Sequence, residues 1–496
     1  MVGAYLSCPQ ASCRPGRDQR DVVRHRSRTM ALSRRHFIGT ALALACLPGS
    51  VSARDPAPPA DDAPAWLSRW LAAFNDARAS RYVQFVRAYV PTLVPYLDDD
   101  LGMREASGGF VLLRSERTAP REITAWVRDR RWDRFSRVVL TIGDGRIDDL
   151  AFLGASPPAD FVVRRTGERE ALARLRRKLR TEAAAGRFSG AVLIAKGDDV
   201  LFREAYGSRS IHASRDVTPQ TRFCIGSAGK MFIAVAILQL VQQGRLRLTD
   251  TIAASLPAYP DTPLARTVTI EHLLTHSGGT GDFFGADYER HQAELRTPSD
   301  FIRMFGERAP AFAPGSRWGY SNFGFIVLGA IVEHVTATPW DVHLERCIFR
   351  VAGMASTSSS ASDGDTAAPC TGAAETGLRA LPFYTGLPAG GGYSTVEDLH
   401  RFGVALRDGR LLDGDRLDQL VRPRIAAGTA HWSLGLRVAS RNGASWYGHG
   451  GAAPGVNADV AIYPQSDYRT VVLSNRGHPH ALNVADYIGA RLPLNG

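Results

Sequence analysis

The sequence is almost free of lysine. Of its 60 basic residues only three are lysines, namely Lys178, Lys196 and Lys230. A buried lysine can lose its proton, whereas arginine keeps its charge in proteins. A lysine retained in this background therefore indicates a role that arginine does not fill. The simpler alternative is a codon bias that left three lysines.

Cysteines are few. Residues 1–53, which we expect to be a leader, contain no apolar run long enough to cross a bilayer. The cysteines outside the leader are Cys224, Cys347 and Cys370. An odd number allows at most one internal disulfide, and the spacing does not indicate a zinc site. The apolar stretch 37–47 is shorter than the roughly 20 residues of a membrane helix. We therefore expect neither a disulfide scaffold nor an integral membrane segment after leader removal.

A nucleic-acid partner is not expected either. The formal net charge is +11, but residues 1–35 carry eight arginines against two aspartates, and the remainder is only mildly basic. That remainder has no basic cluster interleaved with aromatic residues. The 496 residues are 44% hydrophobic and 22% charged, a composition typical of a folded globular protein rather than a disordered or fibrous one.

Residues 1–53 resemble an export-signal region of the twin-arginine type. Arg34 and Arg35 precede the apolar stretch, and residues 51–53 form a small-x-small cleavage pattern. Met30 lies just ahead of the signal, and we expect translation to start there. The signal predicts a periplasmic or secreted protein. Lipoprotein anchoring at Cys46 is disfavoured by the residues before it.

A proline-rich linker is predicted at residues 54–64, followed by a small α+β domain of unknown role at 65–165. Trp66, Trp70 and Phe74 recur every four residues, which indicates an amphipathic helix. Four apolar stretches follow, which predict an antiparallel sheet; they lie at 109–114, 123–127, 135–142 and 147–153. The element order resembles nuclear-transport-factor-like or cystatin-like modules.

A second domain is predicted over residues 168–496. It opens with a charged helix at 168–185 and a hairpin at 190–195 and 200–206, and it ends with a helix at about 481–492. Apolar helices alternate with glycine-rich loops in between. The low-complexity loop at 355–377 has too few apolar residues to form a core.

Ser227 and Lys230 begin a uniformly apolar run, residues 231–241, that predicts a buried helix. Their side chains would then lie one turn apart on one face. A lysine amine buried near a helix amino end has a lowered pKa and can take the serine proton. Alternatively, Ser227 caps the helix and Lys230 reaches solvent. The Ser-x-x-Lys pattern alone favours this second interpretation.

Two further segments favour catalysis. Tyr320 and Asn322 lie between a turn and an apolar helix at 323–335, so that a phenol and an amide project from one loop. His449, Gly450, Gly451 and Ala452 precede a strand at 456–463. Glycines there let a substrate approach the backbone, whose amides can bind an oxyanion. Either segment alone would be an ordinary turn.

Together the segments resemble the motifs of the serine β-lactamase and penicillin-binding-protein superfamily, Ser-x-x-Lys, Tyr/Ser-x-Asn and Lys/His-x-Gly. The resemblance extends to residues 270–279, 312–324 and 388–399 and covers about residues 170–492. It implies an α+β fold with a β-lactamase-like catalytic domain, an antiparallel sheet flanked by helices plus an all-α lobe. The active site should lie between sheet and lobe, and the small α+β domain precedes this unit.

The resemblance also implies roles for single residues. Ser227 would be the nucleophile that forms an acyl-enzyme, Lys230 its base, and Tyr320 the second member of the proton relay; which of the last two takes the serine proton stays open. Asn322 would orient substrate, and the N–H groups of Ser227 and Ala452 would form the oxyanion hole. No metal or organic cofactor is implied. The expected partner is a small ester or peptide, including peptidoglycan fragments.

His449 departs from the lysine that penicillin-recognising members usually carry at this place. Histidine is mostly neutral at pH 7 and offers a drug carboxylate no fixed charge. The sequence therefore predicts an exported serine hydrolase of the esterase and D-aminopeptidase branch. The first alternative is a β-lactamase or DD-carboxypeptidase. The second is a non-catalytic peptidoglycan-binding or scaffold protein, which would have no need of a deprotonatable lysine beside Ser227.

Three other interpretations are weaker. His272 and His276 have the spacing of a metal-binding pair on one helix face, but the glutamate of the metalloprotease motif is missing. Ser227 lacks the Gly-x-Ser-x-Gly context of α/β-hydrolases. Cys224 lies in a predicted strand with no histidine nearby in sequence, so we do not expect it to be the nucleophile.

Overall fold

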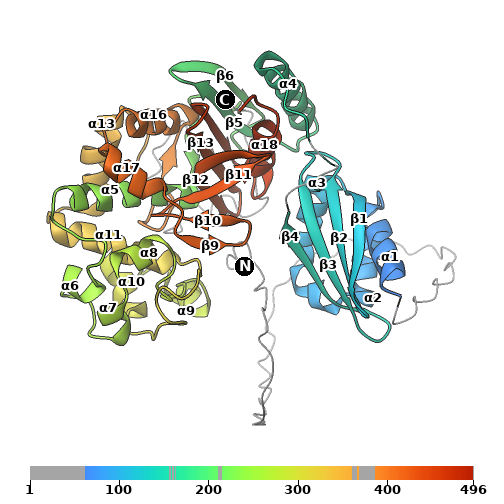
Figure 1. Ribbon diagram of the computed structural model, residues 1–496, viewed down its shortest axis with the longest axis horizontal. Helices are drawn as coiled ribbons and strands as arrows, with labels where there is room; N and C mark the ends of the chain where they lie inside the picture. Colours follow the sequence, from blue (N-terminus) through green and yellow to red (C-terminus); the bar gives the residue numbers. More distant parts are fainter. Residues whose placement is uncertain are drawn as a thin grey trace, which may run out of the picture.

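The computed structural model describes residues 62–155, 158, 161, 163–210, 215–359, 366–367 and 386–494, which form two α+β units (Figure 1). The predicted leader at 1–53 with Cys46, most of the loop at 355–377, and Cys370 lie outside the described residues.

The first unit packs helices against one face of a four-stranded antiparallel sheet. Three helices, α1 (Ala63–Asn75), α2 (Ala79–Tyr89) and α3 (Leu97–Ser107), precede the four strands, which pair in sequence order. The strands are β1 (Phe110–Ala119), β2 (Glu122–Asp129), β3 (Phe135–Ile142) and β4 (Ile147–Gly154). Trp66, Trp70 and Phe74 are fully buried in the core of this unit, as their spacing predicted.

Helix α1 begins inside the segment predicted to be linker. We expected the linker to run to residue 64, but the helix starts at Ala63. The Asp62 carboxylate accepts a hydrogen bond from the N–H of Ala65 (3.0 Å) and so caps the helix. Pro64 fits the first turn because the N–H that it lacks would have no helical partner there.

The second unit is built on an eight-stranded antiparallel sheet. Its strand order is β6-β5-β14-β13-β12-β11-β10-β9, so the first hairpin pairs with the last strand of the chain. The hairpin strands are β5 (Gly190–Lys196) and β6 (Asp199–Tyr206). The later strands are β9 (Ile425–Ala427), β10 (Ala430–Trp432), β11 (Arg437–Arg441), β12 (Ala444–Ala453), β13 (Val456–Tyr463) and β14 (Tyr468–Ser474).

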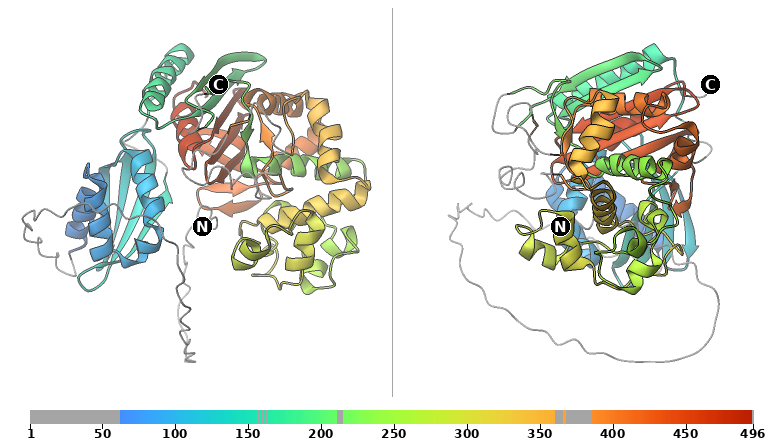
Figure 2. Two further views of the ribbon diagram at one scale, coloured as in Figure 1. Left: turned by 180° about the vertical axis from the view of Figure 1, so that it is seen from behind. Right: turned by 90° about the vertical axis from the view of Figure 1, so that its left-hand side faces the viewer.

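Helices cover both faces of this sheet (Figures 1 and 2). Helices α4 (Glu168–Ala184) and α18 (His480–Gly489) pack on one face, and α16 (Val396–Arg407) packs on the other with α5 (Lys230–Gln242) behind the same core. The fold class predicted from the resemblance is thereby confirmed.

A helical lobe is inserted between β6 and β9. Helix α11 (Asn322–Thr336) is its buried centre, and shorter helices surround it. They are α6 (Ile252–Ser255), α7 (Pro263–Thr267), α8 (Ile270–Leu274), α9 (Ala286–His291), α10 (Pro298–Phe305) and α12 (Trp340–Leu344). Two further short helices lie nearer the sheet, α13 (Arg350–Ala352) against α16 and α17 (Gly414–Val421) against α5. Among the described residues no single helix has the length and apolar character to cross a membrane, although the bent pair of α11 with residues 340–352 does by these criteria.

The two units meet at the turn between β2 and β3. Trp132 in this turn is 3% exposed and belongs to the core that α4 and α18 form with the large sheet. Its ring meets Tyr487 of α18 edge-on at 6.0 Å between centroids. Arg134 pairs with Asp486 of α18 (2.9 Å). The first unit is therefore anchored on the face of the sheet covered by α18.

Candidate active site

Ser227 lies where a short strand gives way to the central helix. Strand β7 (Phe223–Cys224) is followed by a 3-10 turn, η3 (Gly226–Gly229), and then by α5, whose first residue is Lys230. Strand β12 crosses this turn at contact distance, because a Cβ on Gly451 would lie 1.9 Å from the carbonyl oxygen of Ile225. Gly226 has φ 54°, a conformation that suits glycine. The contact thus requires glycine in both elements, at position 226 in η3 and at position 451 in β12.

Lys230 is fully buried, and its amine has three hydrogen-bonding neighbours. Nζ lies 3.1 Å from Oγ of Ser227 and 2.7 Å from Oδ1 of Asn322, and it also donates to the carbonyl oxygen of Ala389. Burial lowers the pKa of Lys230 to about 7, although the nearby Asp282 carboxylate acts in the opposite direction. The interpretation in which Ser227 caps the helix and Lys230 reaches solvent is therefore wrong.

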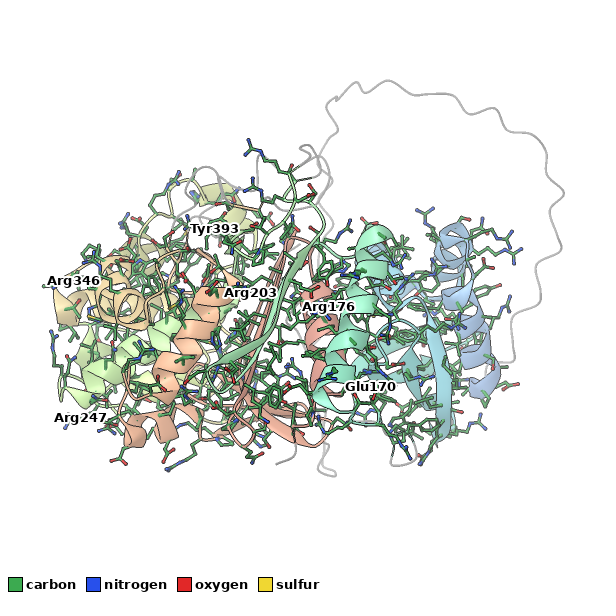
Figure 3. All side chains as sticks on the ribbon, turned by 90° about the horizontal axis from the view of Figure 1, so that it is seen from above. Glu170, Arg176, Arg203, Arg247, Arg346 and Tyr393 are labelled. Carbon is green, nitrogen blue, oxygen red and sulfur yellow. The ribbon has the colours of Figure 1, made fainter. Side chains whose placement is uncertain are left out.

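Arginine carries the surface charge of the same molecule. Figure 3 labels Arg203 and Arg247, whose side chains are 44% and 83% exposed. An arginine at position 230 would remain protonated in this buried environment. The inference that a rare lysine marks a special position therefore holds for the buried Lys230, but not for Lys178 or Lys196.

Tyr320 stands beside the amine as a neutral phenol. Its ring centroid lies 5.0 Å from Nζ of Lys230 and 4.3 Å from the ring centroid of His276, on which it stacks. Burial raises the pKa of Tyr320 well above its ordinary range, although the Ser227 hydroxyl opposes the shift. Of the two candidate bases, Lys230 is the one whose pKa lies near neutral pH.

His449, in β12, is 4% exposed and uncharged at neutral pH. Burial lowers its pKa to about 3, and the Lys230 amine acts in the same direction. As a neutral imidazole it donates from Nδ1 to the carbonyl oxygen of Gly450, which leaves Nε2 as an acceptor. Nε2 has no hydrogen-bond partner among the described residues. Position 449 therefore carries no charge at neutral pH, where a lysine would present a positive charge.

Asp282 is a site residue that the sequence did not reveal. It lies in the loop after α8, where its Oδ2 accepts a hydrogen bond from Nδ2 of Asn322 (2.8 Å). Burial raises its pKa, although hydrogen bonds from Asn322 and from the backbone N–H of Phe283 oppose the shift. The available signal was a lone carboxylate in the glycine-rich stretch 278–285, which follows the segment 270–279.

His272 and His276 do not share a helix face, so the geometry suggested by their spacing is wrong. Helix α8 ends at Leu274, and His276 has a left-handed backbone with φ 56°. His272 closes a capping box with Thr269 at the start of α8. His276 accepts a hydrogen bond at Nδ1 from the N–H of Ser321 (3.2 Å). His276 thus supports the loop that carries Tyr320, whereas His272 stabilises the start of α8.

Cys224 is buried at the end of β7, just before the turn η3 that carries Ser227. Burial raises the pKa of its thiol to about 12, so a thiolate does not form at neutral pH. This agrees with the expectation that it is not a nucleophile.

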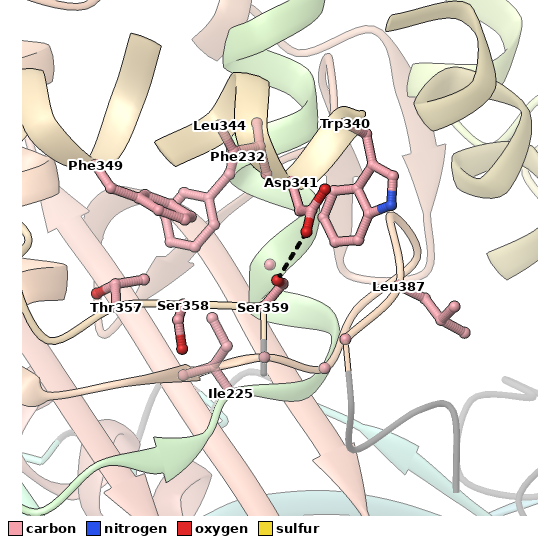
Figure 4. Close-up of a pocket in the computed structure, with 14 residues that line it drawn as sticks. Ile225, Phe232, Trp340, Asp341, Leu344, Phe349, Thr357, Ser358, Ser359 and Leu387 are labelled. Carbon is pink, nitrogen blue, oxygen red and sulfur yellow. Dashed lines mark hydrogen bonds between the residues drawn. The ribbon is translucent and has the colours of Figure 1, made fainter. Parts of the chain in front are cut away.

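A narrow pocket near the site contains none of the predicted catalytic side chains. It lies between α5 and the glycine-rich segment 386–392, and Ile225, Phe232 and Trp340 help to line it (Figure 4). Asp341 on its wall accepts a hydrogen bond from Ser359 (3.4 Å). The pocket reaches Gly229 but not Ser227 or Lys230, so we do not assign it to the reaction.

Known proteins resemble this chain in the region of the site. A family model described as β-lactamase matches residues 175–493. Esterase EstB of Burkholderia gladioli is 34% identical over 188 residues, which cover 34% of this chain and 46% of the esterase. A penicillin-binding protein of Bacillus halodurans has 31% identity and a TM-score of 0.57, covering 63% of this chain and 99% of that one.

A D-amino acid amidase from Ochrobactrum anthropi SV3, at 22% identity and a TM-score of 0.55, shares the fold over 64% of this chain and 97% of its own. Fold and relatives define a serine hydrolase. The chain belongs to the β-lactamase family, in the superfamily that includes the penicillin-binding proteins.

Proposed function

We propose that the protein is an exported serine hydrolase that cleaves an ester or amide bond, including those of D-amino-acid derivatives, through an acyl-enzyme on Ser227. The observation that carries the choice of substrate is the neutral His449. A neutral imidazole at this position offers a substrate carboxylate no positive charge. Uncharged esters and amides therefore suit the site better than carboxylated β-lactams.

The reaction follows from the contacts of Ser227. Neutral Lys230 takes the proton from the serine Oγ, 3.1 Å away, as Oγ attacks the substrate carbonyl carbon. The backbone N–H groups of Ser227 and Ala452 stabilise the oxyanion that forms. The proton then passes to the leaving alkoxide or amine, directly or through the Tyr320 phenol. Water, activated by the same amine, releases the acid and restores Ser227.

Turnover of three substrates tests this proposal. We expect the protein from residue 54 onward to hydrolyse a p-nitrophenyl short-chain ester or a D-alanyl anilide, and to act far more slowly on a chromogenic cephalosporin. Ser227→Ala serves as the blank. Fast serine-dependent cephalosporin turnover would favour the β-lactamase alternative.

One relative also supports a second candidate function. A penicillin-binding protein with 31% identity supports action on peptidoglycan peptides as the alternative substrate class. Release of D-alanine from a peptide ending in D-alanyl-D-alanine, with no ester turnover, would favour this DD-carboxypeptidase. If the protein hydrolyses none of these substrates and forms no covalent intermediate, the scaffold interpretation would be favoured.

A further inference from the structure

Four polar groups from three distant segments form one hydrogen-bonded chain. The Asp282 carboxylate accepts from Nδ2 of Asn322 at 2.8 Å, and Oδ1 of the same amide accepts from Nζ of Lys230 at 2.7 Å. Nζ lies 3.1 Å from Oγ of Ser227. The nucleophile is thus connected to Asp282 through an amide and an amine.

The direction of the Asn322 amide follows from Asp282. Oδ2 of Asp282 accepts a hydrogen bond from Nδ2 of Asn322, so the amide turns its NH2 group toward Asp282 and its oxygen toward Lys230. The second oxygen of the carboxylate accepts from the N–H of Phe283 (2.7 Å), which fixes the orientation of the carboxylate. Asn322 itself is 4% exposed, so bulk water does not compete for its amide.

The amide direction decides where the amine of Lys230 is basic. A neutral amine has two N–H groups and one lone pair. Two of its three neighbours, Oδ1 of Asn322 and the carbonyl oxygen of Ala389, only accept hydrogen bonds, so they take both N–H groups. The lone pair then points at the third neighbour, the Ser227 hydroxyl. If the amide turned over, its NH2 group would compete for the same lone pair.

We propose that Asp282 is a positioning residue which, by holding the Asn322 amide in one orientation, aims the lone pair of Lys230 at the Ser227 hydroxyl. This inference rests on the proposed function and adds to it the group that prepares the base. Asp282 does not touch the reacting atoms. It acts through Asn322, and its negative charge also stabilises the protonated form of Lys230.

The charge of Asp282 gives the proposal a pH signature. The groups that surround the Lys230 amine are Asp282, the Tyr320 phenol, and two histidines, His276 and His449, both held neutral by burial. Among these Asp282 is the one carboxylate. Its loss lowers the pKa of Lys230, so the amine stays deprotonated to a lower pH.

The test compares Asp282→Asn with wild type in the full mature chain. The substituted side chain has the same shape, so retention of the fold is expected and is checked by the melting temperature. We expect kcat for an ester to fall about 100-fold, as for a misaligned catalytic group, with KM little changed. The acid limb of the kcat/KM profile should move to lower pH. Asp287→Asn, on an exposed carboxylate of the neighbouring helix α9, is the matched control and should change neither quantity.

A second measurement separates this proposal from the proposed function. The rate at which a fluorophosphonate labels Ser227 depends on activation of the serine but not on the natural substrate, so it can be measured even if no ester is turned over. Slow labelling of Asp282→Asn with a shifted pH profile supports the positioning role. Labelling and turnover within twofold of wild type, with an unmoved acid limb, would overturn it, and so would a loss of rate whose pH profile does not move.

Discussion

Lys230 differs from the other two lysines in what surrounds its amine. Lys178 pairs with Glu182 on α4 (3.5 Å), and Lys196 is exposed at the end of β5, where its amine lies over the ring of Tyr468. Neither contact requires a proton to be lost. Of the three lysines, only Lys230 is buried beside a serine hydroxyl. Its amine, with a pKa of about 7, can accept the proton of that hydroxyl.

Lys230→Arg is expected to keep the fold and lose nearly all turnover. The guanidinium stays protonated, so it cannot accept the serine proton, and loss of a general base costs about 100- to 10,000-fold in rate. Steady-state kinetics with a p-nitrophenyl ester, together with a thermal melt, provides the measurement. Lys196→Arg is the matched control and should retain wild-type activity. An active Lys230→Arg enzyme would refute the role of the amine as proton acceptor.

Activity should rise with pH through about 7. Below this pH Lys230 is protonated and cannot act as a base, whereas above it the neutral amine predominates. His449, with a pKa of about 3, contributes no step in this range. The kcat/KM profile of wild type between pH 5 and 9 should therefore show one acid limb, and His449→Gln should leave its position unchanged. A profile flat from pH 5 upward would contradict this assignment.

The candidate residues Ser227, Lys230, Tyr320, Asn322 and His449 could be selected from the sequence because each lies in a short motif. Asp282 and the carbonyl oxygen of Ala389 could not. The hydrogen bonds from Lys230 to Asn322 and Ala389 span 92 and 159 residues, so no local pattern reveals them. A backbone carbonyl also has no sequence signature at all.

At the scale of elements, the position of the nucleophile depends on how closely β12 crosses η3. Two glycines make this approach, Gly226 in the turn and Gly451 in the strand. At this contact, a Cβ atom added to Gly226 would lie 3.2 Å from the backbone N of Ala452. The proposed oxyanion hole, formed by the N–H groups of Ser227 and Ala452, would therefore depend on the contact between these two elements.

Gly451→Ala tests this contact. The added methyl group would lie 1.9 Å from the carbonyl oxygen of Ile225, so strand and turn must separate. We expect kcat to fall about 100-fold, because small misplacements of catalytic groups have effects of that size. Gly414→Ala in α17, where a Cβ meets nothing within 4 Å, should leave kinetics and melting temperature unchanged. Wild-type kinetics for Gly451→Ala would show that the close approach is unimportant.

Most elements could be predicted because their periodicity is local. Strands β3 and β13 match the predicted residues, and α4 and β6 differ from prediction by one residue at one end. Strand β1 continues to Ala119, beyond the predicted end at residue 114, because its later residues are exposed and give no apolar signal. Two other failures have a local cause. Asp62 starts α1 early, and the left-handed His276 lies beyond the end of α8, which removes it from the predicted helix face.

At the scale of the whole molecule, the family resemblance implied an antiparallel sheet flanked by helices, and in that sheet β5 pairs with β14. The docking of the first unit was not predictable. Trp132 lies in a turn of the first unit, and nothing in its local sequence indicates that its ring completes the core of the second.

Trp132→Ala should weaken the attachment of the two units. Truncation of a buried tryptophan typically costs about 3–5 kcal/mol, and here the loss falls on the contact with α4 and α18. We expect a lower melting temperature with ester turnover at 25 °C preserved, because the site lies within the second unit. Trp126→Ala, on a half-buried residue of β2 outside the shared core, should lower stability less. Equal effects of the two substitutions would contradict the proposed anchoring role.

The covalent intermediate is the most direct test of the account. The protein from residue 54 onward is mixed with a p-nitrophenyl ester, quenched in acid within the first turnover, and analysed by intact mass and peptide mapping. We expect one added acyl group on the peptide that contains Ser227, formed by wild type and absent from Ser227→Ala. Ester turnover that continues in Ser227→Ala, or an acyl group on another residue, would contradict it.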